Sequence, residues 1–126
     1  MIVVRIIMKV LPEKHKEVMQ TLLSINSPMG IELPEEENDY PVYDIFCDIE
    51  NKNIFNLISE WETRRYLDDH LKSDRFGVLL GTKSLLCEPL EIRILTVSDS
   101  EGMEAVKSAR KKSKIRQNKE KRSRLI

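Results

Sequence analysis

Cysteine, histidine and glycine are scarce in this chain, and their scarcity excludes several kinds of site. The 126 residues include two cysteines, Cys47 and Cys87, which form no CxxC pair, and two widely separated histidines. These residues lack the spacing of metal ligands, so the sequence predicts no metal site. The four glycines form no GxGxxG, P-loop or GxSxG motif, which removes the common nucleotide-binding and serine-hydrolase signatures.

Long apolar runs are also absent. No stretch approaches 18 consecutive apolar residues, so the sequence predicts no membrane span. The first residues, MIVVRII, lack both a long apolar core and a small-residue cleavage site, so we expect no signal peptide. Both cysteines lie in apolar stretches of sequence, where we expect reduced thiols, as in a cytoplasmic protein. Cys47 lies on a predicted strand, where we expect a core position.

The formal net charge of zero hides a strong asymmetry between the two parts of the chain. Residues 1–102 contain 11 Lys/Arg and 19 Asp/Glu, whereas residues 103–126 contain 10 Lys/Arg and 2 Asp/Glu. We therefore expect a folded domain over 1–98 and a basic extension over 99–126 that is partly helical or disordered. The end of the chain has no aromatic residue for base stacking, which leaves a solubilising role or electrostatic contact with nucleic acid.

Hydrophobic periodicity gives the order β-α-β-β-α-β. Strands are predicted over 2–10, 42–50, 54–61 and 90–97, and helices over 13–26 and 63–86, with Thr63 as a cap and Ser73 as a second cap or a kink. An acidic, proline-containing loop covers 27–41. This order predicts an α+β, ferredoxin-like fold, in which a four-stranded antiparallel sheet carries its helices on one face.

The predicted strands have apolar residues on both alternate faces. In the strand 42–50, for example, Tyr43, Ile45 and Cys47 point one way, while Val42 and Phe46 point the other. Helices on one side leave the second face uncovered. We therefore expect a homodimer in which two sheets pack face to face into a barrel-like core.

The stretch SEWETRRYLDDHLKSDRF, residues 59–76, carries a resemblance to a known family. The strand that ends in Trp61, the helix with Asp69-His70-Leu71 and the following Ser73-Asp74-Arg75-Phe76 resemble the antibiotic biosynthesis monooxygenase domain family, which includes small quinol monooxygenases. By element order the resemblance extends over 1–98. It implies a dimeric α+β barrel with a pocket between sheet and helices. In some members that pocket oxidises a quinol or polyketide aromatic with molecular oxygen and without a metal or flavin cofactor.

The resemblance implies a site around the chain's only tryptophan and one of its histidines. We expect His70 to act as base or hydrogen-bond donor toward a phenolic ligand and Trp61 to stack against that ligand. Tyr66, Leu67 and Leu57 are expected to line the same pocket, because the helix and strand periods bring them to one seam. The resemblance adds Phe76 to this lining. The alternative interpretation is ordinary core packing of the tryptophan and histidine.

Two further interpretations of the whole chain stay open beside the monooxygenase. One is a small-molecule binding or sensor dimer that uses the pocket without turnover. The other is a structural dimer whose basic extension binds a polyanion. Elsewhere in the chain, His15 is expected to be solvated on the charged side of its helix, and Glu35-Glu36-Glu37 lacks the alternating ligands of a calcium loop.

Overall fold

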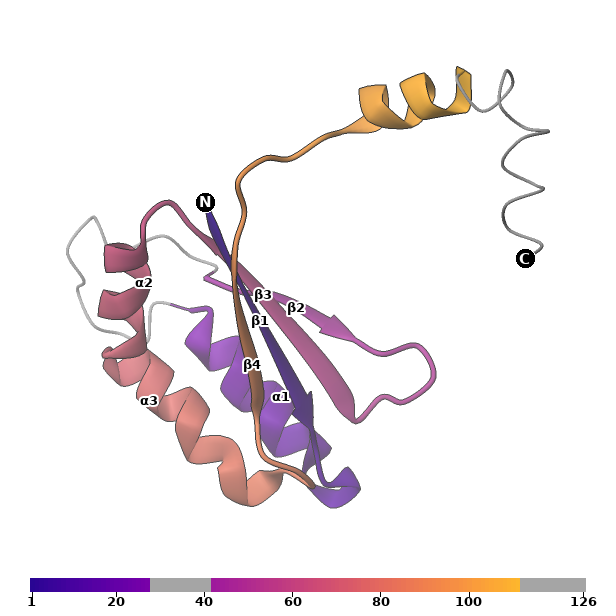
Figure 1. Cartoon of the computed structure of the whole chain (residues 1–126). Helices are drawn as coiled ribbons and strands as arrows, with labels where there is room; N and C mark the ends of the chain where they lie inside the picture. The colour runs from indigo at the N-terminus through magenta and orange to yellow at the C-terminus, as the bar shows by residue number, and fades with distance from the viewer. Residues whose placement is uncertain (28–41, 112–126) are drawn as a thin grey trace.

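Four antiparallel strands form one sheet, and the helices lie across one of its faces (Figure 1). The computed structural model describes residues 1–27 and 42–111. The elements in chain order are β1 (Ile2–Lys9), η1 (Pro12–Lys14), α1 (His15–Ile25), β2 (Asp44–Cys47), β3 (Ile54–Trp61), α2 (Arg64–Leu71), α3 (Asp74–Leu80), η3 (Gly81–Leu85) and β4 (Glu91–Thr96). The strand order is β2-β3-β1-β4, so the predicted α+β, ferredoxin-like topology is confirmed.

The helix predicted over 63–86 is divided into separate pieces. Thr63 caps α2, and Ser73 caps α3, each by accepting a hydrogen bond from the backbone N–H three residues ahead. A 3-10 segment then continues to Leu85. The two predicted caps are therefore confirmed, and they place a bend in the chain between Leu71 and Asp74.

The second strand is shorter than predicted, with a physical reason at its end. The sequence pattern indicated 42–50, whereas β2 ends at Cys47. The Asp48 carboxylate accepts hydrogen bonds from the backbone N–H groups of Glu50 and Asn51, at 3.0 and 2.9 Å. This side-chain turn competes with sheet pairing and takes the chain into the hairpin that leads to β3.

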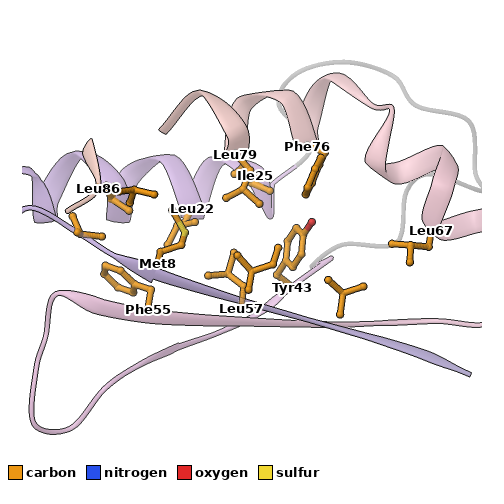
Figure 2. Packing of buried hydrophobic residues seen from close by; sticks show 14 of the residues in the cluster. Met8, Leu22, Ile25, Tyr43, Phe55, Leu57, Leu67, Phe76, Leu79 and Leu86 are labelled. Carbon is orange, nitrogen blue, oxygen red and sulfur yellow. The ribbon is translucent and has the colours of Figure 1, made fainter. Parts of the chain in front are cut away.

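The core lies between the helices and one face of the two central strands. Alternate residues of β1 and β3 point toward α1 and α3 because side chains alternate along a strand. Figure 2 shows Met8, Phe55 and Leu57 of the sheet directed at Leu22 of α1 and Leu79 of α3, and all five are buried. This one-sided burial is the main apolar contact of the fold.

The other face of the sheet carries no helix. Phe46 on β2 and Leu95 on β4 are 53% and 43% exposed there, and Ile7 and Ile58 of the central strands are half-buried. Charged residues separate these apolar side chains, for instance Arg5, which pairs with Ile58 across the sheet. The prediction of apolar residues on both faces is thus confirmed, although this face is mixed in character.

Cys47 differs from its expected core position. Cys47 and Cys87 are exposed and unbridged. Cys47 is the last residue of the edge strand β2, and its thiol donates a hydrogen bond to the carbonyl oxygen of Lys52 at 3.2 Å. Edge positions and turns receive no cover from the helical layer, so an apolar sequence neighbourhood did not produce burial here.

Beyond β4 the chain extends to a helix over 103–111 that stands apart from the sheet (Figure 1). All its residues are exposed except Ala105, which is half-buried. Within the described ranges, none of the helices combines the length and apolarity that crossing a bilayer requires. The acidic loop 27–41 predicted from sequence lies outside the described residues, apart from Ser27.

Candidate functional site

His70 lies at the centre of a cluster of aromatic rings at the seam between sheet and helices. It is half-buried on α2, and its ring contacts rings from three other segments. Trp61, at the end of β3, stacks on it with ring centroids 4.7 Å apart and planes 29° apart. Tyr43 lies 5.5 Å away, and Phe76 of α3 meets it edge-on at 5.6 Å. We refer to these four residues as the ring cluster.

The bend between α2 and α3 holds two members of the ring cluster. The Ser73 hydroxyl donates to the carbonyl oxygen of His70 at 2.6 Å and accepts from the backbone N–H of Phe76 at 3.2 Å. One small side chain therefore joins the end of the helix that carries His70 to the start of the helix that carries Phe76. This explains how two short helices keep their rings in contact.

Trp61 is fixed from the sheet side. Its indole Nε1–H donates to the hydroxyl of Ser59 at 2.9 Å, and Ser59 is buried on the same face of β3. A buried indole N–H needs such a partner. The ring is therefore held flat against His70, with part of its surface still exposed.

Tyr43 brings a buried hydroxyl to the histidine. The residue is 2% exposed, and its hydroxyl is hydrogen-bonded to Nε2 of His70. Burial raises the pKa of the Tyr43 phenol above its usual value, and burial lowers the pKa of His70 to about 4. Both groups are neutral at pH 7, so the ring nitrogen of His70 that carries the proton decides which of the two donates this bond.

Asn26, at the end of α1, positions Tyr43. Its side-chain amide donates to the carbonyl oxygen of Tyr43 at 2.7 Å, and its oxygen accepts from the backbone N–H of Tyr43 at 3.0 Å. These two bonds tie the helix end to the residue just before β2, 17 positions later in the chain. The position of the Tyr43 hydroxyl relative to His70 is therefore set by α1 as well as by the sheet.

The structure brings together some of the residues predicted for the site and separates others. Trp61, His70 and Phe76 meet in the ring cluster, and Leu57 and Leu67 lie fully buried in the core. Tyr66 differs from the prediction, because it is 53% exposed and joins none of the ring contacts. It lies about 100° around α2 from Leu67, which takes the inward position of this short helix.

Sequence reasoning missed Tyr43 as a member of the site. The available signal was the alternation in VYDIFCDIE, which puts Tyr43 on the same strand face as Ile45. That pattern indicated an inward side chain but could not show that the ring meets His70. The meeting depends on the packing of α2 against the sheet.

His15 is the other correction, since it was expected to be solvated. It is half-buried, and its ring lies 5.3 Å from the ring of Phe55. Phe55 is near the start of β3 and Trp61 is its last residue, so His15 belongs to the opposite end of the sheet. Within 1–27 and 42–111, no group of three or more His, Cys, Asp or Glu residues is placed to hold a metal ion.

The arrangement offers three chemical capabilities. Trp61 presents a flat apolar face to an aromatic ring. His70 is neutral near pH 7 and can accept a hydrogen bond or a proton. The Tyr43 hydroxyl, which is hydrogen-bonded to Nε2 of His70, still has a lone pair that can accept a hydrogen bond from a ligand.

Comparisons with known proteins point to one family. The sequence profile described as "Antibiotic biosynthesis monooxygenase" matches residues 1–79, which include every member of the ring cluster. A comparison with curated proteins found no match.

Solved structures share the fold. A crystal structure of an antibiotic biosynthesis monooxygenase is 19% identical, with a TM-score of 0.63 over 79% of this chain and 100% of that one. Rv0793 from Mycobacterium tuberculosis is 18% identical, with a TM-score of 0.65 over 80% and 98%. A conserved protein from Methanosarcina mazei Go1 is 28% identical, with a TM-score of 0.60 over 75% and 89%. The first two identities are low enough that these likenesses establish the fold alone.

The Asn26 contact makes a first prediction. Asn26→Ala removes both bonds to Tyr43 and should lower the free energy of unfolding by about 1–2 kcal/mol. Gln20→Ala, at an exposed position on the same helix, should change it by less than about 0.5 kcal/mol. Urea unfolding followed by Trp61 fluorescence measures both. Equal effects of the two substitutions would show that the Asn26 contact does not hold Tyr43.

The lowered pKa of His70 makes a second prediction. The unfolded chain regains the ordinary histidine pKa of about 6.5, so below that pH it binds a proton that the native state, with a pKa of about 4, does not. The free energy of unfolding contributed by His70 is thus present at pH 7 and lost as the pH falls. Its loss by pH 5 should be on the order of 2 kcal/mol.

A non-titrating variant isolates this effect from other groups. His70→Gln keeps an acceptor for the Tyr43 hydroxyl but binds no proton. Urea unfolding of both proteins at pH 7, 6 and 5 should show the native protein losing more stability than the variant. All other groups are the same in the two proteins, so their contributions cancel in the difference. A difference that stays constant from pH 7 to pH 5 would mean that His70 titrates normally.

Proposed function

The chain belongs to the antibiotic biosynthesis monooxygenase family, and on this basis we propose that it oxidises quinol-like or polyketide aromatic small molecules with molecular oxygen, without a metal or flavin. The observation that carries the proposal is the ring cluster, in which a neutral histidine is stacked on Trp61 and hydrogen-bonded to a buried tyrosine.

The reaction balances without a further reductant. A quinol and one molecule of oxygen give a hydroxylated quinone and one molecule of water. One oxygen atom replaces a ring hydrogen, and the other leaves as water. The quinol supplies the electrons, and removal of its phenolic proton makes that transfer easier.

The described residues have separate roles in this proposal. The aromatic ligand lies against the exposed part of Trp61. Its hydroxyl donates to the Tyr43 oxygen, because Nε2 of His70 is already engaged by Tyr43. As the ligand loses its proton to Tyr43, the Tyr43 proton moves to His70. Burial of the pair keeps both groups in the protonation states that this relay needs at pH 7.

One observation favours binding without turnover as the second candidate. The pKa of about 4 makes His70 a weak base, and a weak base gives a phenol little driving force for proton transfer. A sensor would need only the stacking surface of Trp61 and the hydrogen bond that the Tyr43 oxygen accepts from the ligand. The two candidates share a ligand class and differ in oxygen consumption.

Oxygen uptake with naphthoquinols provides the third prediction and separates the two candidates. The protein should consume oxygen above the rate of buffer autoxidation. Tyr43→Phe and His70→Leu should each lower kcat by about 10²–10⁴-fold, because each interrupts the proton relay. Tyr66→Phe is the matched control, since this exposed tyrosine lies outside the ring cluster.

Each result identifies one candidate. Quenching of Trp61 fluorescence by naphthoquinones without oxygen uptake would establish the binding role. Neither quenching nor uptake with any quinol of a panel would leave the ring cluster as packing. Equal losses in Tyr43→Phe and Tyr66→Phe would contradict the relay.

We also infer that the functional unit is a homodimer that buries the face of the sheet opposite the helices. The support is the exposed apolar side chains that this mixed face carries, among them Phe46 and Leu95. Such a surface on two copies permits a symmetric contact. The contact would close the barrel-like core expected from the sequence.

Sedimentation velocity at micromolar concentration tests the fourth prediction. The unmodified chain should sediment as a dimer, and Phe46→Lys should shift it toward monomer by burying a charge in the contact. Leu23→Lys is the control, because Leu23 is 63% exposed on α1, in the helical layer. A monomer in every sample, or an equal shift for both variants, would contradict the sheet-to-sheet contact.

A further inference from the structure

Two polar groups of the ring cluster have hydrogen-bond partners of different chemistry. The indole Nε1–H of Trp61 donates to the hydroxyl of Ser59 at 2.9 Å. The Tyr43 hydroxyl is hydrogen-bonded to Nε2 of His70. A serine hydroxyl is a very weak base, whereas an imidazole that is neutral at pH 7 has a ring nitrogen that can take a proton. Of these two rings, the tyrosine therefore has the proton acceptor beside it.

The rings also form a continuous contact from the surface into the core. Trp61 is half-buried, whereas Tyr43 is 2% exposed, and Figure 2 shows Tyr43 among the buried core side chains. The imidazole of His70 contacts both rings, with centroids 4.7 Å from Trp61 and 5.5 Å from Tyr43. Aromatic rings in contact pass an electron readily, because the electron has little space to cross between them. An electron from the buried tyrosine can therefore reach the surface through Trp61.

Loss of an electron changes the acidity of a phenol. A tyrosine that has lost one electron is a strong acid, so even a weak base beside it takes the proton. The pKa of about 4 gives His70 little driving force toward an intact phenol, but such a base is sufficient for an oxidised one. The tautomer that serves this step carries its proton on Nδ1, which leaves Nε2 as the acceptor.

We propose that the ring cluster is also a one-electron relay, in which Trp61 gives an electron to an oxygen-centred radical at its exposed face and Tyr43 then restores Trp61. In the first step an organic peroxyl radical becomes a peroxide anion. Trp61 becomes an indole radical cation and keeps its proton, because the Ser59 hydroxyl is too weak a base to take it. In the second step one electron passes from Tyr43 to Trp61, and the phenolic proton moves to Nε2 of His70. The products are an intact indole, a neutral tyrosyl radical and an imidazolium.

This relay moves the oxidising equivalent from the surface to a buried ring. Asn26 holds the backbone of Tyr43 by two hydrogen bonds, so the radical forms at a fixed position. A quinol can later return one electron to Tyr43 and release one proton to solvent, which leaves a semiquinone. The proton on His70 then goes back to the Tyr43 oxygen. The relay inserts no oxygen atom into a ligand, so it goes beyond the proposed oxidation and does not depend on it.

Flash oxidation with a ruthenium tris-bipyridine complex and persulfate tests the proposal, with transient absorption of the indole and tyrosyl radicals as the readout. The chain contains three tyrosines, Tyr40, Tyr43 and Tyr66. Y40F/Y66F leaves Tyr43 as the one tyrosine, whereas Y40F/Y43F leaves Tyr66, which is 53% exposed. In Y40F/Y66F the indole signal should decay as the tyrosyl signal rises. In Y40F/Y43F, which lacks the proposed electron donor, the indole signal should last at least about tenfold longer.

The proton transfer has a separate readout that a packing role would not change. In Y40F/Y66F the second step should be slower in D2O than in H2O, because the phenolic hydrogen moves with the electron. Adding His70→Gln keeps a hydrogen-bond acceptor but removes the base, and it should slow this step by at least about tenfold. The matched control is His15→Gln, at the opposite end of the sheet beside Phe55, and it should leave the rate unchanged. Circular dichroism verifies that the variants keep the native melting temperature.

Three outcomes would overturn the proposal. Equal lifetimes of the indole radical in Y40F/Y66F and Y40F/Y43F would show that Tyr43 does not restore Trp61. Equal rates with His70→Gln and His15→Gln would show that His70 does not receive the proton. A tyrosyl signal of full size after Trp61→Phe is added to Y40F/Y66F would show that the electron does not leave through Trp61. These experiments contain no quinol, so their outcome is distinguishable from that of the oxygen-uptake test.

Discussion

The burial of a single face of the central strands is the constraint on which the rest of this structure depends. Alternate side chains of β1 and β3 fill the space beneath α1 and α3, and none of the fully buried ones carries a charge. Polar groups that enter this layer must find partners within it, because water is excluded. This requirement applies to Tyr43, Trp61 and His70 of the ring cluster, whose side chains carry polar atoms.

At the end of this layer, the polar atoms of Tyr43 and Trp61 have hydrogen-bond partners within the fold. Tyr43 is bonded to His70, and the indole N–H of Trp61 is bonded to Ser59. The same desolvation moves the pKa values of Tyr43 and His70 in opposite directions, so both are neutral at pH 7. A ring cluster with no net charge suits the neutral aromatic ligand that we propose for it, and the contact from Asn26 keeps the tyrosine in place.

The excess of positive charge and the ring cluster lie in different regions of this chain. The described fold is nearly balanced, whereas the segment 103–126 is strongly basic. Interactions of that segment act over roughly a Debye length and weaken with salt, whereas the ring cluster acts through short contacts shielded from solvent. The two regions therefore respond to different changes in conditions, namely ionic strength and pH.

By itself, the sequence determined the order of elements, the inward faces of the strands and the caps at Thr63 and Ser73, because these follow from local periodicity and local hydrogen bonds. It also placed Trp61 and His70 at one seam. Tertiary structure alone decided that Tyr43 bonds to His70 while Tyr66 faces solvent. Those outcomes depend on how α2 is oriented on the sheet and on the side-chain amide of Asn26, 17 residues before Tyr43. A local sequence pattern encodes neither the distance nor the orientation between separate elements.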